Sequence, residues 1–456
     1  RKEIRKMEDE VFQGDIKGVV RQFPHDVQEM FYKKAEDRST YEQQLVELIN
    51  RQIRNKRSKT KWDKKFEKDE ELKSKYEKLQ LKLASLGTKP SLPQAFITTD
   101  LSDQPARTFI PGKKRKEPSP AFLALLGLPN PEIKPTPHGT TGRRLALANW
   151  IASPDNPLST RVIVNRVWQK HFGKGLVGSA NDFGFLGEEP SHPELLDWLA
   201  ADFRERGWDV QNLLKTIMLS ATYRQQSGLN LDNTHDPGND LYHHYPRQRL
   251  TAEQIRDQAL YVSGLLIEKT GGPSVKPYQP DGLWQEVAMQ QSNTRTFERG
   301  SGDDLWRRSL YTYWKRAAPP PSMMALDAPT REYCSARRIT TNTPLQALVL
   351  WNDEQFVEAA RSTAERILLE SDQDDERIKL LFKRCTGDPP TDLIHKAVVD
   401  TLADYRQTFG VDSEAARRLI SVGASPVDDR LPVDELAAWT MLTNAVLSSD
   451  AAIVKD

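Results

Sequence analysis

The sequence predicts a mainly α-helical protein, and three observations support this prediction. Apolar residues recur at helical spacing along most of the chain, helix start signals are frequent, and strand signals are sparse. The chain has 456 residues, 38% of them hydrophobic, which is enough for two or three domains with packed cores. We therefore expect an N-terminal helical hairpin, a proline-rich connector and a larger helical domain with a small β element.

The hairpin is expected over residues 1–86. One apolar stripe has the four–three spacing of a coiled-coil seam and is formed by Leu72, Tyr76, Leu79, Leu83 and Leu86. A second stripe, the expected antiparallel partner, is formed by Tyr41, Leu45, Ile49 and Ile53. The excess of Lys and Arg over residues 54–82 is either a solvated helix face or a surface for an anionic polymer. The chain opens inside a charged helical pattern without Met, so we expect a fragment of a longer protein.

The connector is expected over residues 87–137, where ten prolines fall. Proline fixes φ and has no backbone N–H, so this composition is typical of extended chain. Short edge strands are predicted at 96–99 and 108–110, and a small helix at 121–126.

The larger helical domain is expected over residues 138–456. Capping boxes are read at Ser191–Glu194, at Thr251–Gln254 and at Thr343–Gln346. Helices are predicted near 142–152, 159–172, 192–206, 209–224, 251–267, 343–370, 374–385, 391–408, 413–422 and 433–448. The clearest β run is 309–314, which is rich in Tyr and Trp.

The first candidate site is a polar cluster around the glycine-rich loop 173–191, between two predicted helices. An acid/base pair of Asp182 with Glu188 or Glu189 is one interpretation, with His192 as a further catalytic candidate. Candidate ligand-binding residues of this cluster are Asn165, Arg166, Trp168, His171 and Glu189. The competing interpretation is structural: Trp168 in the core, His171 hydrogen-bonded at a helix end, and Asp182 capping the turn at Gly184.

The second candidate site contains Arg337, Arg338 and Asn342, just before a predicted helix. Paired arginines beside a helix N-terminus hold a carboxylate or a sulfate. Alternatively, they pair with the chain's own carboxylates, namely Asp327, Glu332, Glu253 or Asp257. Cys334 and Cys385 either form a disulfide or remain free thiols.

Composition excludes several classes of protein. The net charge of +1 provides no field for nucleic acid, and no apolar stretch is long enough to span a membrane. The adjacent pair His243–His244 points its rings apart on either a strand or a helix, and no HExxH, CxxC, P-loop or GxGxxG motif occurs. We therefore expect no metal site and no cofactor in this chain.

Several long segments resemble a known family. They include GRRLALANWIASPDNPLSTRVIVNRVWQKHF at the start of 142–227, RLTAEQIRDQAL at 249–260 and RRITTNTPLQALVLWND at 337–353. Further matching segments are 271–284, 307–329 and 435–452. Together they resemble the planctomycete-specific C-terminal domain (PSD-one, domain of unknown function fifteen-fifty-three), over essentially all of 138–456. Residues 1–100 resemble the tail of a cytochrome-associated domain of unknown function.

The resemblance implies a context more than a reaction. It implies a secreted or envelope protein, extracytoplasmic, in which a missing N-terminal cytochrome c domain carries the haem. It also implies carbohydrate-degrading surroundings with a sulfatase-like companion protein. We expect a module that handles poly- or oligosaccharide, by binding or by oxidative or hydrolytic processing. The alternative is a non-catalytic module that docks the cytochrome domain or a companion protein.

Overall fold

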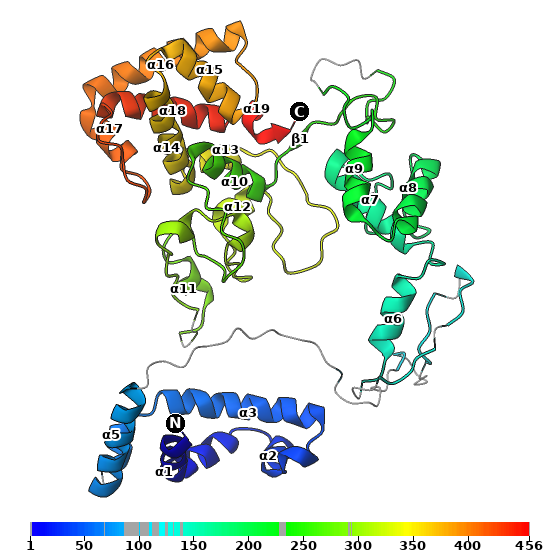
Figure 1. Ribbon diagram of the computed structural model, residues 1–456, viewed down its shortest axis with the longest axis vertical. Helices are drawn as coiled ribbons and strands as arrows, with labels where there is room; N and C mark the ends of the chain where they lie inside the picture. Colours follow the sequence, from blue (N-terminus) through cyan, green and yellow to red (C-terminus); the bar gives the residue numbers. More distant parts are fainter. Residues whose placement is uncertain are drawn as a thin grey trace. The chain divides into compact units, whose positions relative to one another are not determined.

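The computed structural model describes residues 2–67, 69–85, 100, 109–111, 118–123, 126–130, 132–136, 140–227, 234–290, 292 and 294–455. The chain divides into two compact units, unit 1 over Arg1–Ser159 and unit 2 over Thr160–Asp456. In both units the described secondary structure is almost entirely helical (Figure 1), which confirms the predicted fold class.

The helices of unit 1 have between 5 and 19 residues. They are α1 (Lys2–Val20), α2 (His25–Tyr32), α3 (Thr40–Ser58), α4 (Trp62–Phe66) and α5 (Glu70–Ser85), followed after the connector by α6 (Arg143–Ile151). The predicted stripes are buried at Ile49, Ile53 and Tyr76, Tyr41 is exposed, Leu86 lies outside the described residues, and each stripe packs against α1. Ile49 and Ile53 of α3 contact Phe12, whereas Tyr76 of α5 packs with Ile4 and Met7. The partner of both stripes is therefore a third helix, at the start of the chain.

A buried arginine joins these helices. The Arg57 guanidinium is ion-paired with Glu8, at 2.9 Å, and with Asp9. It also lies over the Phe12 ring, 5.0 Å from its centroid. Because the charge is compensated by two carboxylates, its burial is tolerated.

Much of the proline-rich connector lies outside the described residues, including the strand predicted at 96–99 and the first residue of the one predicted at 108–110. In the described part, the Phe122 ring stacks on Trp150 of α6, with centroids 4.9 Å apart. Asp100 accepts hydrogen bonds from Thr141 and pairs with Arg144, which fixes the start of α6. Gly142 is at φ +72, where a Cβ atom would collide with the carbonyl oxygen of Lys134.

Unit 2 contains the remaining helices, from 4 to 20 residues long. They are α7 (Ser159–Phe172, whose first residue falls in unit 1), α8 (Pro193–Glu205), α9 (Val210–Leu219), α10 (Ala252–Ser263), α11 (Leu283–Val287), α12 (Pro321–Ala325), α13 (Pro344–Asn352), α14 (Glu354–Glu370), α15 (Asp374–Cys385), α16 (Asp392–Val411), α17 (Ser413–Ile420), α18 (Val433–Leu447) and α19 (Asp450–Ile453). The strands β1 (Gln248–Arg249) and β2 (Val454–Lys455) pair antiparallel.

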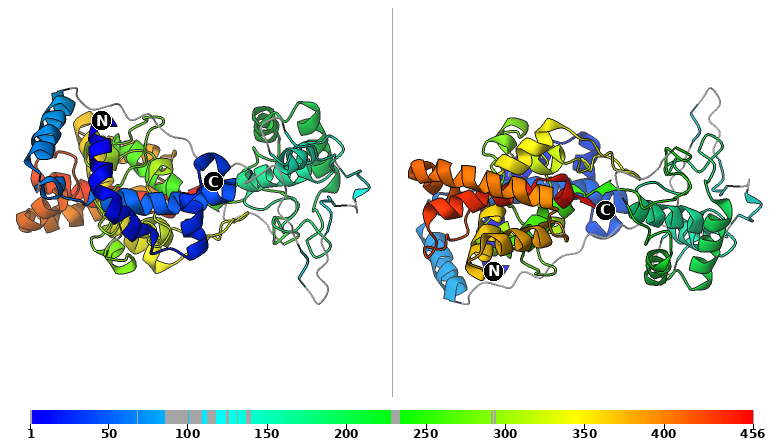
Figure 2. Two further views of the ribbon diagram at one scale, coloured as in Figure 1. Left: turned by 90° about the horizontal axis from the view of Figure 1, so that it is seen from below. Right: turned by 90° about the horizontal axis from the view of Figure 1, so that it is seen from above.

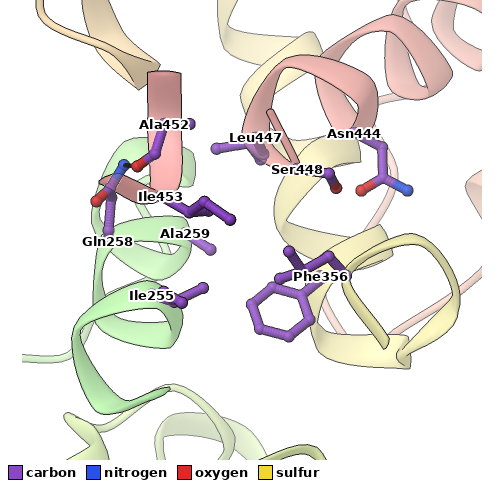
Figure 3. A pocket seen from close by; sticks show the side chains of 10 residues that line it. Ile255, Gln258, Ala259, Phe356, Asn444, Leu447, Ser448, Ala452 and Ile453 are labelled. Carbon is purple, nitrogen blue, oxygen red and sulfur yellow. Dashed lines mark hydrogen bonds between the residues drawn. The ribbon is translucent and has the colours of Figure 1, made fainter. Parts of the chain in front are cut away.

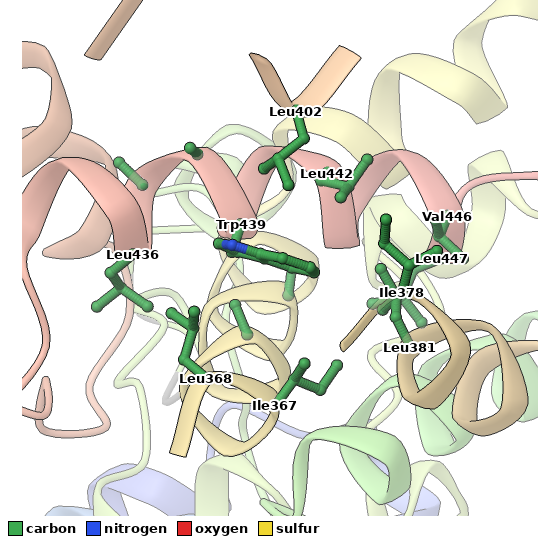
Figure 4. Packing of buried hydrophobic residues seen from close by; sticks show 14 of the residues in the cluster. Ile367, Leu368, Ile378, Leu381, Leu402, Leu436, Trp439, Leu442, Val446 and Leu447 are labelled. Atoms are coloured by element: carbon green, nitrogen blue, oxygen red, sulfur yellow. The ribbon is translucent and has the colours of Figure 1, made fainter. Parts of the chain in front are cut away.

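The largest core of unit 2 surrounds α18. Trp439 is completely buried there and lies between Leu368 of α14, Leu402 of α16 and Leu381 of α15 (Figure 4). Helices α16 and α18 run side by side in both further views (Figure 2). Because α18 is apolar on nearly every side, it forms the centre of this bundle.

Three predictions about elements in unit 2 were wrong in detail. The helix predicted over 343–370 is two helices, because Asp353 has an extended backbone and caps α14 through Gln355 N. The helix predicted to reach residue 267 ends at Gly264, which adopts φ +78. Residues 309–311 form a 3₁₀ turn, and only an isolated bridge from Thr312 to Val275 remains of the predicted strand at 309–314.

The capping boxes predicted at Thr251 and at Ser191 have different outcomes. At Thr251, the side chain accepts from Gln254 N while Gln254 Oε1 accepts from Thr251 N, as predicted. At the start of α8 the N-cap residue is His192, and the Ser191 hydroxyl donates to the Leu176 carbonyl. Ser191 therefore anchors the glycine-rich loop, and the predicted Ser191–Glu194 capping box was wrong.

Candidate functional site

The glycine-rich loop 173–191 is held to α7 by one buried amide. Asn165 donates to the Val177 carbonyl at 3.0 Å and accepts from Val177 N at 2.8 Å. Gly175 is required beside it, because a Cβ atom there would lie 2.7 Å from the Asn165 amide. Asn165 thus pairs with the backbone as a neighbouring strand would, and positions the start of the loop.

The aromatic residues of α7 belong to the core. Trp168 is buried, stacks on Phe172 and donates from Nε1 to the Tyr242 hydroxyl at 2.9 Å. His171 Nδ1 lies 2.9 Å from the Val167 carbonyl, one turn earlier in the same helix. The structure thus places both residues as the structural interpretation expected.

The three catalytic candidates make local contacts. Asp182 is exposed, and its Oδ1 accepts from Gly184 N at 2.8 Å. Glu188 is exposed and its backbone N–H donates to Ser179 Oγ, whose hydroxyl donates to the Asp182 carbonyl. His192 Nδ1 lies 3.0 Å from Ser191 Oγ. Arg166 and Glu189 are exposed to solvent.

A concavity lies elsewhere in unit 2. It is formed where the end of α7, β1, the start of α10 and the segment 331–340 meet. Its volume is about 790 Å³, and we call it the cationic cleft. Two carboxylates line it, Glu253 and Asp257. The cationic side chains that line it are Lys170, Arg249, Arg308, Arg331, Arg337, Arg338 and Lys455. Of the predicted site residues, the cleft brings together Arg337 and Arg338; Asp182, Glu188 and His192 are not among its lining residues.

Two of these arginines are paired with carboxylates. Arg338 makes a bidentate contact with Glu253, at 2.6 and 3.1 Å. Burial alone raises the pKa of Glu253, but the hydrogen bonds from Arg338 outweigh it, and the pKa lies below its ordinary value. Arg249 pairs with Asp327 at 2.6 Å and also donates to the Gln346 side chain at 2.7 Å.

Asp327 also fixes the end of the 331–340 segment. Its carboxylate accepts from Thr341 N at 2.7 Å and from the Thr341 hydroxyl. The last candidate of this region, Asn342, is exposed and is not among the lining residues of the cleft.

The other cations that line the cleft have weaker contacts with carboxylates or none. Within the described residues, the side chains of Lys170 and Arg337 have neither an ion pair nor a hydrogen bond, and both are exposed. Arg308 is 60% exposed and lies 3.7 Å from Asp257. Arg331 lies over the Trp314 ring, 4.2 Å from its centroid. The cleft therefore keeps an excess of positive charge that faces solvent.

Lys455 of β2 also lines the cleft. Its Nζ donates to the hydroxyls of Tyr223 and Tyr245, at 2.8 Å each. Burial by itself lowers the pKa of Lys455, but these two hydrogen bonds outweigh it and raise the pKa, so the side chain remains a cation.

Sequence reasoning missed most of the cleft. Lys170, Arg249, Arg308 and Lys455 lie far apart in the sequence and have no local motif. A partial signal was present for Gln169, a polar residue on the apolar side of α7. It is only 7% exposed, it lines the cleft, and its Oε1 has no hydrogen-bond partner in the described part of the chain.

A small space inside the core of unit 2 cannot hold a ligand. It lies between α10, α14, α18 and α19 (Figure 3) and has a volume of about 10 Å³. Phe356, Leu447 and Ile453 line it, together with the polar atoms of Asn444 and Ser448. Such a volume holds at most one water molecule, so this space is a feature of core packing.

The described residues hold neither a metal-ion cluster nor a helix that could cross a membrane. They contain no group of three or more His, Cys, Asp or Glu side chains arranged to hold a metal ion. None of their helices has the length and apolar character that crossing a membrane requires. Cys334 is an exposed free thiol, and Cys385 is a buried one whose pKa is raised by burial to about 12. The disulfide alternative is therefore not what the structure shows.

Fold and cleft together define a helical protein with a solvent-facing cationic cleft. Comparison with protein families then places it: residues 143–402 match the family described as PSD1, Protein of unknown function (DUF1553). The match spans more than half of the chain, so the chain belongs to this family. It covers every residue that lines the cleft except Lys455. No curated protein and no solved structure matches the chain.

Proposed function

We propose that the cationic cleft binds an anionic oligosaccharide, one that carries sulfate or carboxylate groups. The observation that carries the proposal is the pair of unpartnered cations, Lys170 and Arg337, in a cleft of about 790 Å³. A concave site strengthens the attraction of such cations for an anion, because its walls exclude part of the screening solvent. Their guanidinium and ammonium groups match the oxygen atoms of a sulfate or a carboxylate.

The neutral part of the lining suits sugar hydroxyl groups. Thr340 offers a hydroxyl, and Gln248 offers the oxygen of an amide whose Nε2 already donates to the His171 carbonyl. A volume of this size is in the range of small-molecule sites in proteins. The exposed Leu310 adds an apolar contact for the carbon face of a sugar ring.

The resemblance noted in the sequence supports a saccharide rather than another anion, because it implies carbohydrate-degrading surroundings. The attached cytochrome c domain, the sulfatase-like companion and the extracytoplasmic location stay predictions from that resemblance. We assign ligand binding to the cleft, and no bond-breaking step. Asp182, Glu188 and His192 stand outside the lining of the cleft and have no part in it.

The first prediction concerns the two unpartnered cations. Arg337→Ala and Lys170→Ala are each expected to weaken binding of a sulfated heparin disaccharide roughly tenfold, because each removes a charge-assisted hydrogen bond. Isothermal titration calorimetry of the full chain measures this. Matched controls are Arg417→Ala and Lys396→Ala, which remove exposed cations from α17 and α16, outside the cleft.

The same titrations decide whether the cleft or the loop is the site. The variants Asp182→Asn, Glu188→Gln and His192→Asn should bind the disaccharide like the wild type, and neutral cellobiose should bind more weakly. Equal affinity of the Arg337, Lys170 and control variants would refute the proposal. A loss confined to the Asp182, Glu188 and His192 variants would instead place the ligand at the glycine-rich loop.

A second candidate function is docking of a cytochrome domain or a companion protein. The observation that favours it is Phe185 and Leu186, which are almost completely exposed at the tip of the glycine-rich loop. A double substitution of Phe185 and Leu186 by Ser tests it. It should abolish association with a purified cytochrome c domain from the parent protein and leave disaccharide binding unchanged.

A further inference from the structure

The cationic cleft is one of two positively charged concavities along the same helix. We infer that a polyanionic saccharide chain lies along the exposed side of α10 and occupies both concavities at once. This inference rests on the proposed function and deepens it, because it makes the ligand a chain of several charged sugars rather than a single unit.

The second concavity lies at the other end of α10. Its volume is about 830 Å³, and we call it the distal pocket. Its charged lining residues are Arg366, Lys383, Arg384 and a single carboxylate, Glu268. Cations therefore outnumber carboxylates here as they do in the cleft.

The cations of the distal pocket have hydrogen-bonding capacity left. Lys383 is exposed and its side chain has no partner among the described residues. Arg384 pairs with Glu370 through Nη2, but its Nη1 is buried without a partner in the described part of the chain. Arg366 uses Nη1 for the Val262 carbonyl at 2.7 Å. Its approach to the helix end needs Gly264, where a Cβ atom would lie 3.0 Å from Nη1.

Both concavities open on one side of α10. Glu253 and Asp257 line the cleft, and Tyr261 and Gly264 line the distal pocket. The spacing of these four positions is four, four and three, so they form one stripe along the helix. The opposite side of α10 is buried, with Ile255 and Ala259 in the core.

An aromatic ring belongs to the α10 stripe, in the lining of the distal pocket. Tyr261 is 69% exposed although it belongs to a helix whose other large apolar residues are buried. An exposed ring with a polar hydroxyl suits the face of a sugar, which presents C–H groups flanked by hydroxyls. Along the stripe, Glu253 and Asp257 lie beside Arg338 and Arg308 of the cleft, and Tyr261 follows at the distal pocket.

The distance between the two concavities along α10 sets the minimum length of a ligand that occupies both. Glu253 and Gly264 are eleven residues apart, which corresponds to about 16 Å along the axis at 1.5 Å per residue. A disaccharide cannot reach from one concavity to the other, whereas an octasaccharide can. Occupying both regions with one molecule raises affinity without any new kind of contact, because the second contact is intramolecular.

The experiment is a length series. Heparin di-, tetra- and octasaccharides are titrated into the full chain, with a neutral malto-octaose and a single-stranded oligonucleotide of similar charge as comparisons. We expect the octasaccharide to bind at least tenfold more tightly than the disaccharide. Tyr261→Ala and Lys383→Ala should each weaken octasaccharide binding several-fold and leave disaccharide binding unchanged. Matched controls are Tyr32→Ala in unit 1 and Lys396→Ala on α16, both exposed.

The outcomes separate this inference from the proposed function. If the disaccharide binds through Lys170 and Arg337 but the octasaccharide gains nothing, the inference fails and the proposed function stands. If no saccharide depends on Lys170 or Arg337, both fail. An octasaccharide gain that Tyr261→Ala and Lys383→Ala leave intact also overturns the path along α10, and tighter binding of the oligonucleotide overturns the choice of a saccharide.

Discussion

Asn165 shows how a single side chain decides the geometry of the glycine-rich loop. Its amide replaces a strand partner for Val177 and is completely buried. In the sequence it is one polar residue in a helix, and nothing there indicates a backbone partner twelve residues later. The sequence makes Asn165 a candidate ligand-binding residue, whereas the contact that explains it is structural.

The prediction at this scale is a loss of stability. Asn165→Ala should lower the free energy of unfolding by about 2–4 kcal/mol, because it leaves a buried N–H and a buried carbonyl of Val177 unpaired. Urea unfolding followed by circular dichroism measures this. The control is Asn352→Ala, an exposed amide at the end of α13, which should cost less than about 0.5 kcal/mol. Equal losses in the two variants would contradict the role given to Asn165.

At the scale of elements, an ion-pair network joins three helices of the α18 bundle. Arg406 of α16 donates to Asp374 at the start of α15, at 2.6 and 3.0 Å, and to Glu435 at the start of α18, at 2.8 Å. Arg377 adds a second contact to Asp374 at 3.1 Å. Both carboxylates also lie in first turns, where the helix dipole favours negative charge.

This network predicts a dependence of stability on pH. The hydrogen bonds from Arg406 are the main reason why the pKa of Asp374 lies below its ordinary value. A carboxylate with a lowered folded-state pKa stabilises the fold above the unfolded-state pKa and stops doing so as pH falls through the folded-state pKa. Asp374→Asn should therefore cost about 1 kcal/mol at pH 7, allowing for solvent screening of this partly exposed group, and progressively less below about pH 4.

Urea unfolding at pH 7 and at pH 3 measures the difference. Asp404→Asn, which removes an exposed carboxylate from α16, is the matched control and should cost little at either pH. A cost of Asp374→Asn that is as large at pH 3 as at pH 7 would contradict the assignment to an ionised pair.

At the scale of the whole molecule, the chain has two compact units and the cleft belongs to unit 2. A ligand stabilises only the state that binds it, by about 2.7 kcal/mol at a hundredfold excess over its dissociation constant. The heparin octasaccharide should therefore raise the melting temperature of unit 2 and leave that of unit 1 unchanged. Added salt should reduce this shift, because it screens the cations of the cleft.

Differential scanning calorimetry of the full chain tests this expectation. Trp439→Ala identifies the transition of unit 2, since the loss of this fully buried ring should cost about 3–5 kcal/mol there. A ligand-induced shift in the transition that Trp439→Ala leaves in place would contradict the location of the site.

The sequence by itself determined the helical class and most helix positions, because periodicity and caps such as Thr251 are local properties that neighbouring residues satisfy. It also determined membership of the family, because long matching segments survive without any knowledge of contacts. Only the tertiary structure decided which cations stay unpaired. Arg337 and Arg338 are adjacent and chemically identical, yet Arg338 is bound to Glu253, eighty-five positions earlier, and Arg337 is not. Compensation of charge depends on which distant carboxylate the fold brings near, and that is a property of packing rather than of sequence spacing.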